Sequence, residues 1–346
     1  MTVDPLRLED GRVFVLDQTR LPEEERWIEA GEPAAMAEAI AALRVRGAPA
    51  IGIAAALALA FEAARAGGGR GERLERFRRA ATLLRATRPT AVNLAWAVDR
   101  MLATAERAPD DAWAAALRAE ALAIWEEDRA ASRAMAAHGA ALFPEARRFL
   151  THCNTGGLAT GGLGTALAVL LELHHRREGG IAVWATETRP LLQGARLTAW
   201  ELLRAGVPVR VVTDGAAASL LLRERIEGVL VGADRVARNG DAANKVGTYP
   251  LALAAREAGI PFVVVAPTST LDPSLPDGAS IPIEERDPEE VRSFRGAAAA
   301  PRGVPVENPA FDVTPARLIT YLVTEQGVRR PSAGEAAAGA PVPPGG

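Results

Sequence analysis

Reactive side chains follow short apolar stretches in the second half of the sequence. Cys153 comes after the stretch 148–151, and Asp234 comes after the stretch 228–232. The carboxyl ends of strands in an open parallel sheet meet at one edge, and ligands bind beyond that edge. We therefore expect the thiol of Cys153 and the carboxyl group of Asp234 to share one edge of a sheet. A thiol and a carboxyl group in such a place can relay protons in general acid–base chemistry.

Lys245 is the only lysine among the 40 basic residues of the chain, and it follows Asn244, one of five asparagines. Lysine presents a compact ammonium group, whereas arginine presents a planar fork, so the two do not substitute freely at a tight site. A chain that otherwise uses arginine keeps a lysine mainly where arginine would fail. The scarcity favours a functional site at Asn244 and Lys245, with chance survival of one lysine as the alternative.

Each of these residues also has an ordinary structural interpretation. A single cysteine beside a strand is usually a small core residue, and an aspartate after a strand is often a turn residue. His152 beside Cys153 suggests a metal ligand, but neighbours along a strand point to opposite faces of the sheet. We therefore expect no metal and no redox cofactor. The other histidines lie in helical stretches and are expected on the surface or in packing: His138, His174 and His175.

The loop 154–164 is rich in glycine and threonine and precedes a helical stretch. Its backbone N–H groups could bind an anion at the start of that helix, or the loop could simply be a tight turn. Its glycine spacing matches neither a P-loop nor a dinucleotide-binding fingerprint. Nucleotide binding is therefore not expected.

The elements that position these residues change in character along the chain. Short strands are expected at the start, for example at 12–16, and long helices with Ala, Leu and Arg from 33 to about 138. Turn residues interrupt the helical region near residues 46–49, 67–69, 88–90 and 109–110.

After Pro144, β-branched stretches alternate with amphipathic ones. Strands are expected at 148–151, 181–185, 207–212, 228–232 and 262–266, and helices at 163–175, 191–205, 216–225 and 246–258. This alternation predicts an α/β fold with a mostly parallel sheet that helices cover on both faces. We expect a mainly helical domain at 1–140, a catalytic α/β domain at 141–330 and a disordered Ala/Gly/Pro-rich tail at 331–346.

The composition, with 49% apolar and 24% charged residues, is typical of a soluble globular protein. A net charge of −3 gives no sign of a nucleic-acid surface. The longest apolar run, 51–61, is shorter than the roughly 20 residues that span a bilayer. Charges within 1–10 exclude a signal peptide there, and one cysteine excludes an intrachain disulfide. We expect a cytoplasmic protein that binds neither nucleic acid nor membrane.

Several motifs, in order along residues 10–328, make the chain resemble the methylthioribose-1-phosphate isomerase family of the initiation-factor-2B alpha/beta/delta-like superfamily. The matching stretches are 46–52, 87–93, 151–156, 187–190 with 193–198, 232–235, 239–241 with 244–245, and 308–315. One departure lies at 215–220, where the Asn-Met-Ala-Ala pattern that is usual in the family is missing.

The resemblance implies a homodimer whose subunits have a small helical domain and a Rossmann-like domain. It also implies conversion of 5-methylthioribose 1-phosphate to 5-methylthioribulose 1-phosphate in methionine salvage, with Cys153 and Asp234 as the catalytic pair. The substrate-binding positions of the family fall on Arg46, Gly47, Ala48, Arg88, Gln193, Asn244 and Lys245. Two alternatives stay open. One is isomerisation of 5-deoxyribose 1-phosphate or ribose 1,5-bisphosphate, and the other is a non-catalytic regulatory subunit that binds a sugar phosphate.

Overall fold

A computed structural model describes residues 3–294 and 296–331 of the protein, so the expected tail at 331–346 lies outside the described residues except for Pro331. The chain divides into two compact units. The helical unit comprises residues up to Arg133 together with Gly156–Gly164, and the sheet unit comprises Ala134–Thr155 with the chain from Thr165 onward. A segment that follows Cys153 in the sequence therefore belongs to the helical unit.

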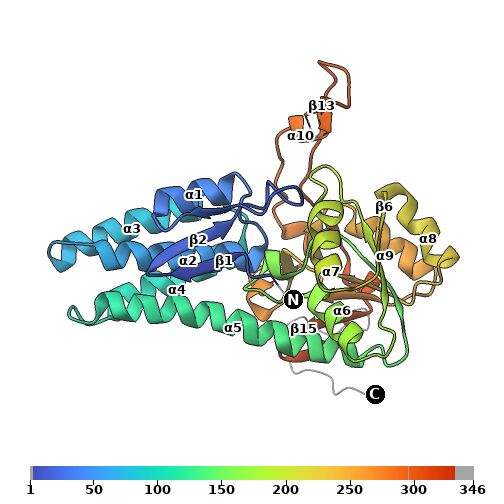
Figure 1. Ribbon diagram of the computed structural model, residues 1–346, viewed down its shortest axis with the longest axis horizontal. Coiled ribbons are helices and arrows are strands. Elements are labelled where there is room, and N and C mark those ends of the chain that lie inside the picture. Colours follow the sequence, from blue (N-terminus) through green and yellow to red (C-terminus); the bar gives the residue numbers. More distant parts are fainter. Residues whose placement is uncertain (1–2, 295, 332–346) are drawn as a thin grey trace. The chain divides into compact units, whose positions relative to one another are not determined.

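The helical unit begins with three antiparallel strands, β1 (Leu6–Glu9), β2 (Arg12–Leu16) and β3 (Trp27–Glu29). Helices follow: α1 (Pro33–Ala41), α2 (Ala48–Arg65), α3 (Arg70–Ala86), α4 (Val92–Arg107) and most of α5 (Trp113–Ala141), drawn in blue to green in Figure 1. The interruptions that the sequence predicts fall between these helices, so the helical pattern is confirmed.

Helix α2 is long and apolar enough to cross a membrane by length and composition alone, but 67% of it is buried inside the structure. It packs closely on α4, because a Cβ atom at Gly52 would lie only 2.8 Å from the carbonyl oxygen of Asn93. Its apolar side chains belong to the main core of the unit, with Phe77, Leu94 and Met101 from the neighbouring helices. The composition of α2 thus serves helix packing.

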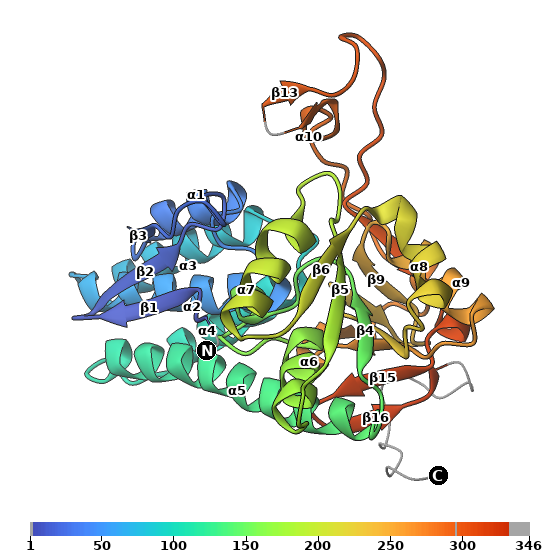
Figure 2. The same cartoon turned by 45° about the vertical axis from the view of Figure 1, so that its right-hand side comes forward.

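The sheet unit contains a seven-stranded sheet in the order β16-β15-β10-β7-β4-β5-β6 (Figure 2). Its strands are β4 (Arg148–Thr151), β5 (Ala182–Thr186), β6 (Val209–Val212), β7 (Gly228–Val231), β10 (Phe262–Val265), β15 (Tyr321–Thr324) and β16 (Gly327–Arg329). All neighbouring pairs are parallel except β15 with β16. The predicted strands are present, and β15 and β16 extend the sheet beyond the prediction.

Helices pack on this sheet as the alternating pattern predicts. They are α6 (Ala166–His175), α7 (Ala199–Arg204), α8 (Ala217–Arg223) and α9 (Thr248–Glu257), and a π-helical turn at Gly194–Thr198 leads into α7. On one face of the sheet, Val229, Val231 and Val264 share a buried cluster with Leu220 of α8 and Leu251 of α9.

A second sheet, which the sequence did not predict, lies beyond the carboxyl end of β7. Its strands are ordered β11 (Leu271–Asp272), β8 (Arg235–Ala237), β9 (Ala242–Lys245) and β14 (Phe311–Thr314). A short helix α10 (Glu289–Arg292) and two short strands, β12 (Ser293–Phe294) and β13 (Ala297–Ala298), precede β14. Asn244 and Lys245 therefore lie on a strand that is paired on both sides.

Candidate active site

Cys153 and Asp234 follow two neighbouring strands at the centre of the seven-stranded sheet. The chain passes from β4 through β5 to β6 and then returns to β7, which pairs with β4 on its other side. Thr151 lies opposite Leu230 in this pair, and paired strands are about 4.8 Å apart. The two residues therefore extend from the same edge at the point where the strand order reverses, which is the usual ligand site in open α/β sheets.

The backbone holds Cys153 in an unusual conformation. Its φ of 61° lies in the left-handed region, which costs a residue with a side chain about 1–3 kcal/mol. Its N–H donates to Thr188 Oγ1 at 2.9 Å, and its carbonyl oxygen accepts from Thr198 Oγ1 at 2.6 Å. These two bonds hold the backbone of Cys153 and so the direction of its Cα–Cβ bond, and the residue is 7% exposed.

The loop after β5 is held in a similar way by the loop after β6. Thr188 also has a left-handed backbone, with a φ of 64°. The Asp214 carboxylate accepts the backbone N–H groups of Thr188 at 2.8 Å and Arg189 at 2.7 Å. The ends of β4, β5 and β6 are thus joined through Cys153, Thr188 and Asp214. Asp214 follows the expected strand 207–212 with one residue between them, and the sequence alone predicts no role for it.

Gln193 lies in the same loop region and is 5% exposed. Its Oε1 atom is buried and accepts no hydrogen bond from the described residues. Buried side-chain oxygens usually have a partner in a protein or in its ligand. A substrate hydroxyl group is the kind of donor that would satisfy this atom.

The strand that carries Asn244 and Lys245 is tied to Asp234, which lies between β7 and β8. The backbone N–H of Asp234 donates to the carbonyl oxygen of Ala243 at 2.9 Å, and Asp234 itself is partly buried. Asn244 Nδ2 donates to Thr248 Oγ1 at 2.9 Å. The ammonium group of Lys245, a residue that is 9% exposed, lies 4.9 Å from the centre of the Phe311 ring. Such a cation–π contact attracts the ammonium group to the face of the ring.

Asp312 stabilises the turn that follows Lys245. Its carboxyl group accepts the backbone N–H groups of Gly247 at 2.7 Å and Tyr249 at 3.1 Å, at the start of α9. Burial raises the pKa of Asp312 to about 6, although these N–H groups favour the ionised form. Sequence analysis included Asp312 in a motif without giving it a role.

The remaining predicted residues, Arg46, Gly47, Ala48 and Arg88, belong to the helical unit and are partly buried. Gly47 has a φ of 95°, and a Cβ atom there would lie 2.4 Å from the Cα atom of Ala159. Arg46 precedes α2 and Arg88 precedes α4. Because Gly52 brings the first turns of these two helices together, both arginines stand at neighbouring helix N-termini, where an anion is favoured.

Several backbone N–H groups in and after the loop 154–164 donate to protein acceptors, so these groups do not provide the anion site that the glycine-rich loop suggested. The N–H groups of Gly161 and Gly164 donate to Asp128 and Thr160 side chains at 2.6 and 2.8 Å. At the start of α6, the N–H groups of Thr165 and Leu167 donate to Thr155. These four donors are already used, which favours the tight-turn interpretation of this loop.

The side chains of His138, His152 and His174 have protein partners. His138 Nδ1 lies 3.1 Å from the carbonyl oxygen of Thr324, and His174 Nδ1 accepts the N–H of Ile181 at 3.3 Å. Both ring nitrogens of His152 are likewise within hydrogen-bond distance of protein oxygens. Within residues 3–294 and 296–331, His, Cys, Asp and Glu side chains form no group of three that could hold a metal ion.

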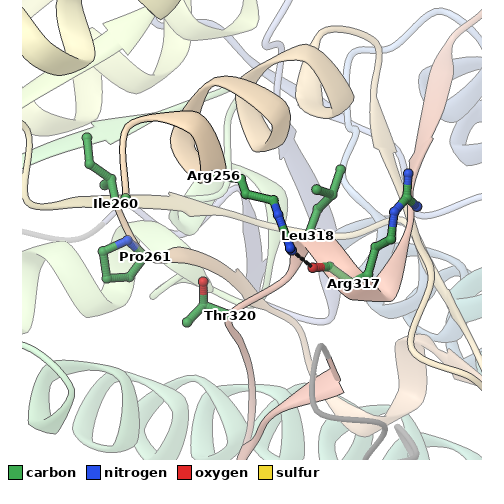
Figure 3. A pocket seen from close by; sticks show the side chains of 7 residues that line it. Arg256, Ile260, Pro261, Arg317, Leu318 and Thr320 are labelled. Carbon is green, nitrogen blue, oxygen red and sulfur yellow. Dashed lines mark hydrogen bonds between the residues drawn. The ribbon is translucent and has the colours of Figure 1, made fainter.

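A surface pocket lies at the opposite, amino edge of the seven-stranded sheet (Figure 3). Pro261 and Thr320, which line it, directly precede β10 and β15. Its volume of about 240 Å³ is below the roughly 300–1,000 Å³ that is typical of small-molecule sites. None of the residues predicted for catalysis or substrate binding lines this pocket.

Comparison with known proteins places these features in a family. A profile described as "Initiation factor 2 subunit family" matches residues 44–331. The chain is 54% identical, over 97% of each protein, to a methylthioribose-1-phosphate isomerase of Desulforudis audaxviator. The crystal structure of 5-methylthioribose 1-phosphate isomerase from Pyrococcus horikoshii is 43% identical, with a TM-score of 0.88 over 95% of this chain and 93% of that one. A structure of translation initiation factor eIF-2B, subunit delta, from A. fulgidus is 39% identical, with a TM-score of 0.84 over 95% and 96%.

Proposed function

The chain belongs to the initiation factor 2 subunit family, and we propose that it converts 5-methylthioribose 1-phosphate into 5-methylthioribulose 1-phosphate in methionine salvage. It is thus an aldose–ketose isomerase. The observation that carries this proposal is the placement of Cys153 and Asp234 after the adjacent strands β4 and β7, in a chain more than half identical to a relative of that name.

The proposed catalytic pair is Cys153 and Asp234. An aldose phosphorylated on its anomeric oxygen cannot open its ring through a free hydroxyl group. An acid must protonate the ring oxygen while the ring C1–O bond breaks, and hydrogen must then move from C2 to C1. We assign the acid to Asp234, in keeping with general acid catalysis by a carboxyl group. The Cys153 thiol relays a proton or stabilises the transition state beside it.

The proposed substrate-binding residues are Arg46, Gly47, Ala48, Arg88, Gln193, Asn244 and Lys245. Arg46, Arg88 and Lys245 pair with the phosphate, and arginine can do so through two parallel hydrogen bonds. Gly47 and Ala48 offer backbone groups at the start of α2, where the helix dipole favours an anion. Gln193 and Asn244 bind sugar hydroxyl groups, which agrees with the buried, unsatisfied Oε1 atom of Gln193 in the described structure.

We further propose that the enzyme works in the cytoplasm as a homodimer, without a metal or redox cofactor and without nucleic-acid or membrane partners. The homodimer rests on the family resemblance. The net charge of −3 and the single cysteine agree with the other expectations. Analytical ultracentrifugation of the full chain tests the dimer, since a monomer at micromolar concentration would contradict it.

A second candidate function is that of a regulatory subunit without catalysis. It is favoured by the 39% identity to the structure named as an eIF-2B delta subunit. The presence of both Cys153 and Asp234 in this chain argues against it, since a binding module has little need of that pair.

The deciding experiment is a turnover assay with 5-methylthioribose 1-phosphate, 5-deoxyribose 1-phosphate and ribose 1,5-bisphosphate, followed by NMR detection of the ketose. We expect the highest kcat/KM for the first substrate. A preference for either of the others would change the assigned substrate but keep the reaction. Absence of turnover with all three, together with measurable binding, would favour the regulatory function.

A further inference from the structure

The side chain of His152 is fully enclosed at the carboxyl edge of the sheet, with 1% of the residue exposed. Its Nδ1 atom lies 2.6 Å from Thr186 Oγ1, and its Nε2 atom lies 2.9 Å from the carbonyl oxygen of Val246. A carbonyl oxygen only accepts, so Nε2 carries the proton and donates to Val246. In a neutral ring Nδ1 carries no proton, and it then accepts from the hydroxyl group of Thr186. The two contacts therefore select one neutral tautomer.

This neutral ring also agrees with its electrostatic surroundings. Burial lowers the pKa of His152, and the charge of Lys245 lowers it further, while the charge of Asp214 and the Val246 carbonyl oppose the change. A neutral imidazole keeps one donor and one acceptor, which is what the two contacts require.

The two partners of the ring belong to two different parts of the proposed active site. His152 directly precedes Cys153, and Val246 directly follows Lys245. On the other side of the ring, Thr186 Oγ1 is 3.2 Å from Thr188 Oγ1, the atom that accepts the N–H of Cys153. A continuous hydrogen-bond network thus runs from the backbone of Cys153, through Thr186 and the imidazole, to the residue after Lys245.

The chain also makes room for the ring on the Lys245 side. A Cβ atom at Gly247 would lie 2.8 Å from His152 Cε1, and Gly247 has a φ of 105°. The imidazole therefore packs directly on the backbone at the start of α9. Hydrogen bonds at both ring nitrogens and this close approach at Cε1 hold the imidazole between the two loops.

We propose that His152 is a positioning residue for the isomerase reaction, which couples the placement of the Cys153 thiol to that of the Lys245 ammonium group. The proposal rests on the proposed function, because it takes Cys153 as catalytic and Lys245 as phosphate-binding. His152 itself does not touch the reacting atoms. A displacement of about 1 Å in such a site can reduce the rate roughly 100-fold.

The test compares two substitutions of His152 that differ in the polar contacts they keep. His152→Phe fills the space but removes both polar contacts, whereas His152→Gln keeps one donor and one acceptor. Thr186→Val is a third variant, which removes the donor to Nδ1 together with the contact between Thr186 Oγ1 and Thr188 Oγ1. His174→Phe is the matched control, since His174 has a single backbone contact with Ile181 at the amino end of β5.

Two measurements are made on each variant. Steady-state kinetics with 5-methylthioribose 1-phosphate separates kcat from KM, and the rate of Cys153 alkylation by iodoacetamide reports on the thiol without turnover. The alkylation signal is specific because Cys153 is the only cysteine of the chain. We expect His152→Phe to lower kcat roughly 100-fold, to raise KM and to change the alkylation rate at least fivefold. We expect His152→Gln to recover most of this loss and His174→Phe to behave like wild type.

The outcomes separate this proposal from the proposed function. If wild type turns over none of the three sugar phosphates, the function fails, and the alkylation rates still decide whether His152 positions Cys153. If wild type is active and His152→Phe keeps normal kcat, KM and alkylation, the positioning role is wrong. The positioning role is also wrong if His152→Gln and His152→Phe change kcat, KM and the alkylation rate to the same extent. If His152→Phe does not fold, Thr186→Val decides, and unchanged kinetics and alkylation in that variant overturn the proposal.

Discussion

The two edges of the seven-stranded sheet hold their polar groups in different ways. At the carboxyl edge, Cys153 and Thr188 have left-handed backbones, and side chains such as Asp214 bind backbone N–H groups of neighbouring loops. At the amino edge, Arg256 and Arg317 are exposed beside an open pocket, and Arg256 Nη1 donates to the carbonyl oxygen of Arg317 at 2.6 Å. The first arrangement holds residues with side chains in costly backbone conformations, whereas the left-handed residue Arg225 near the amino edge, with a φ of 49°, does not line the pocket.

This difference indicates where function lies better than the presence of a cavity does. Left-handed residues with side chains persist only where surrounding contacts hold them, and they gather at active sites. A pocket lined by exposed arginines can form wherever a helix ends near a loop. The carboxyl edge therefore carries the proposed chemistry, although the pocket in Figure 3 lies at the other edge.

The largest effect expected at the carboxyl edge is that of Asp234→Asn. The amide keeps the shape of the side chain but cannot deliver a proton, so we expect kcat to fall roughly 1,000-fold with KM changed less than fivefold. The matched control is Asp272→Asn, since Asp272 is a nearby carboxylate that pairs with Arg235 at 3.2 Å. Steady-state kinetics on both variants gives the answer. Near-normal kcat in Asp234→Asn would remove Asp234 from catalysis.

A smaller effect is expected from Lys245→Arg. Lys245 is 9% exposed against the Phe311 ring, and a larger guanidinium group would overpack this space at a cost of about 1–3 kcal/mol. KM for the sugar phosphate should therefore rise roughly 10- to 100-fold. The reverse exchange, Arg235→Lys, serves as the control and should leave KM within about threefold. Unchanged KM in Lys245→Arg would show that the scarcity of lysine carries no functional meaning.

Much of the fold could be predicted because the sequence pattern is local. The β-branched stretches at 148–151 and 262–266 correspond to β4 and β10, and the turn residues at 46–49 separate α1 from α2. Strand β9 could not be predicted in this way, since Ala242–Lys245 contains no β-branched or aromatic residue. Its conformation comes from pairing with β8 and β14, and β14 lies more than 60 residues away along the chain.

The site could be predicted only in part, for a related reason. Cys153 and Asp234 could be placed at one edge because both follow strand ends, and the carboxyl ends of parallel strands meet at the same edge of a sheet. The roles of His152, Thr188 and Asp312 depend on which loops meet in space and on the left-handed backbone of Thr188. A residue with a side chain gives no sign in the sequence that it will adopt such a conformation. For the same reason, the sequence did not indicate which groups accept hydrogen bonds within the loop 154–164.

The stability of the protein should depend on Asp312 in a way that the amino edge does not share. The pKa of Asp312 is raised from 3.8 to about 6 in the folded protein, so the folded state holds this proton up to a higher pH than the unfolded state. Its contribution to the free energy of unfolding is therefore present below pH 4 and is lost as the pH rises to about 6. Asp312→Asn cannot titrate, and should gain about 3 kcal/mol relative to wild type between pH 4 and 7. Urea unfolding of wild type and Asp312→Asn at pH 4 and pH 7 measures this gain. A difference in the free energy of unfolding that is the same at both pH values would contradict the raised pKa of Asp312.

The smallest effect is expected at the amino edge itself. Arg256→Ala removes one hydrogen bond from an exposed side chain to the Arg317 carbonyl oxygen, which is worth about 1 kcal/mol at most. The combined replacement of Arg256 and Arg317 by Ala should leave kcat/KM within about twofold, because the pocket they line is on the far side of the sheet from Cys153 and Asp234. Arg223→Ala, at another exposed position on α8, provides the comparison for the loss of surface charge. A change of more than fivefold in the double variant alone would mean that ligands at the amino edge influence the active site, and the contrast between the two edges would no longer hold.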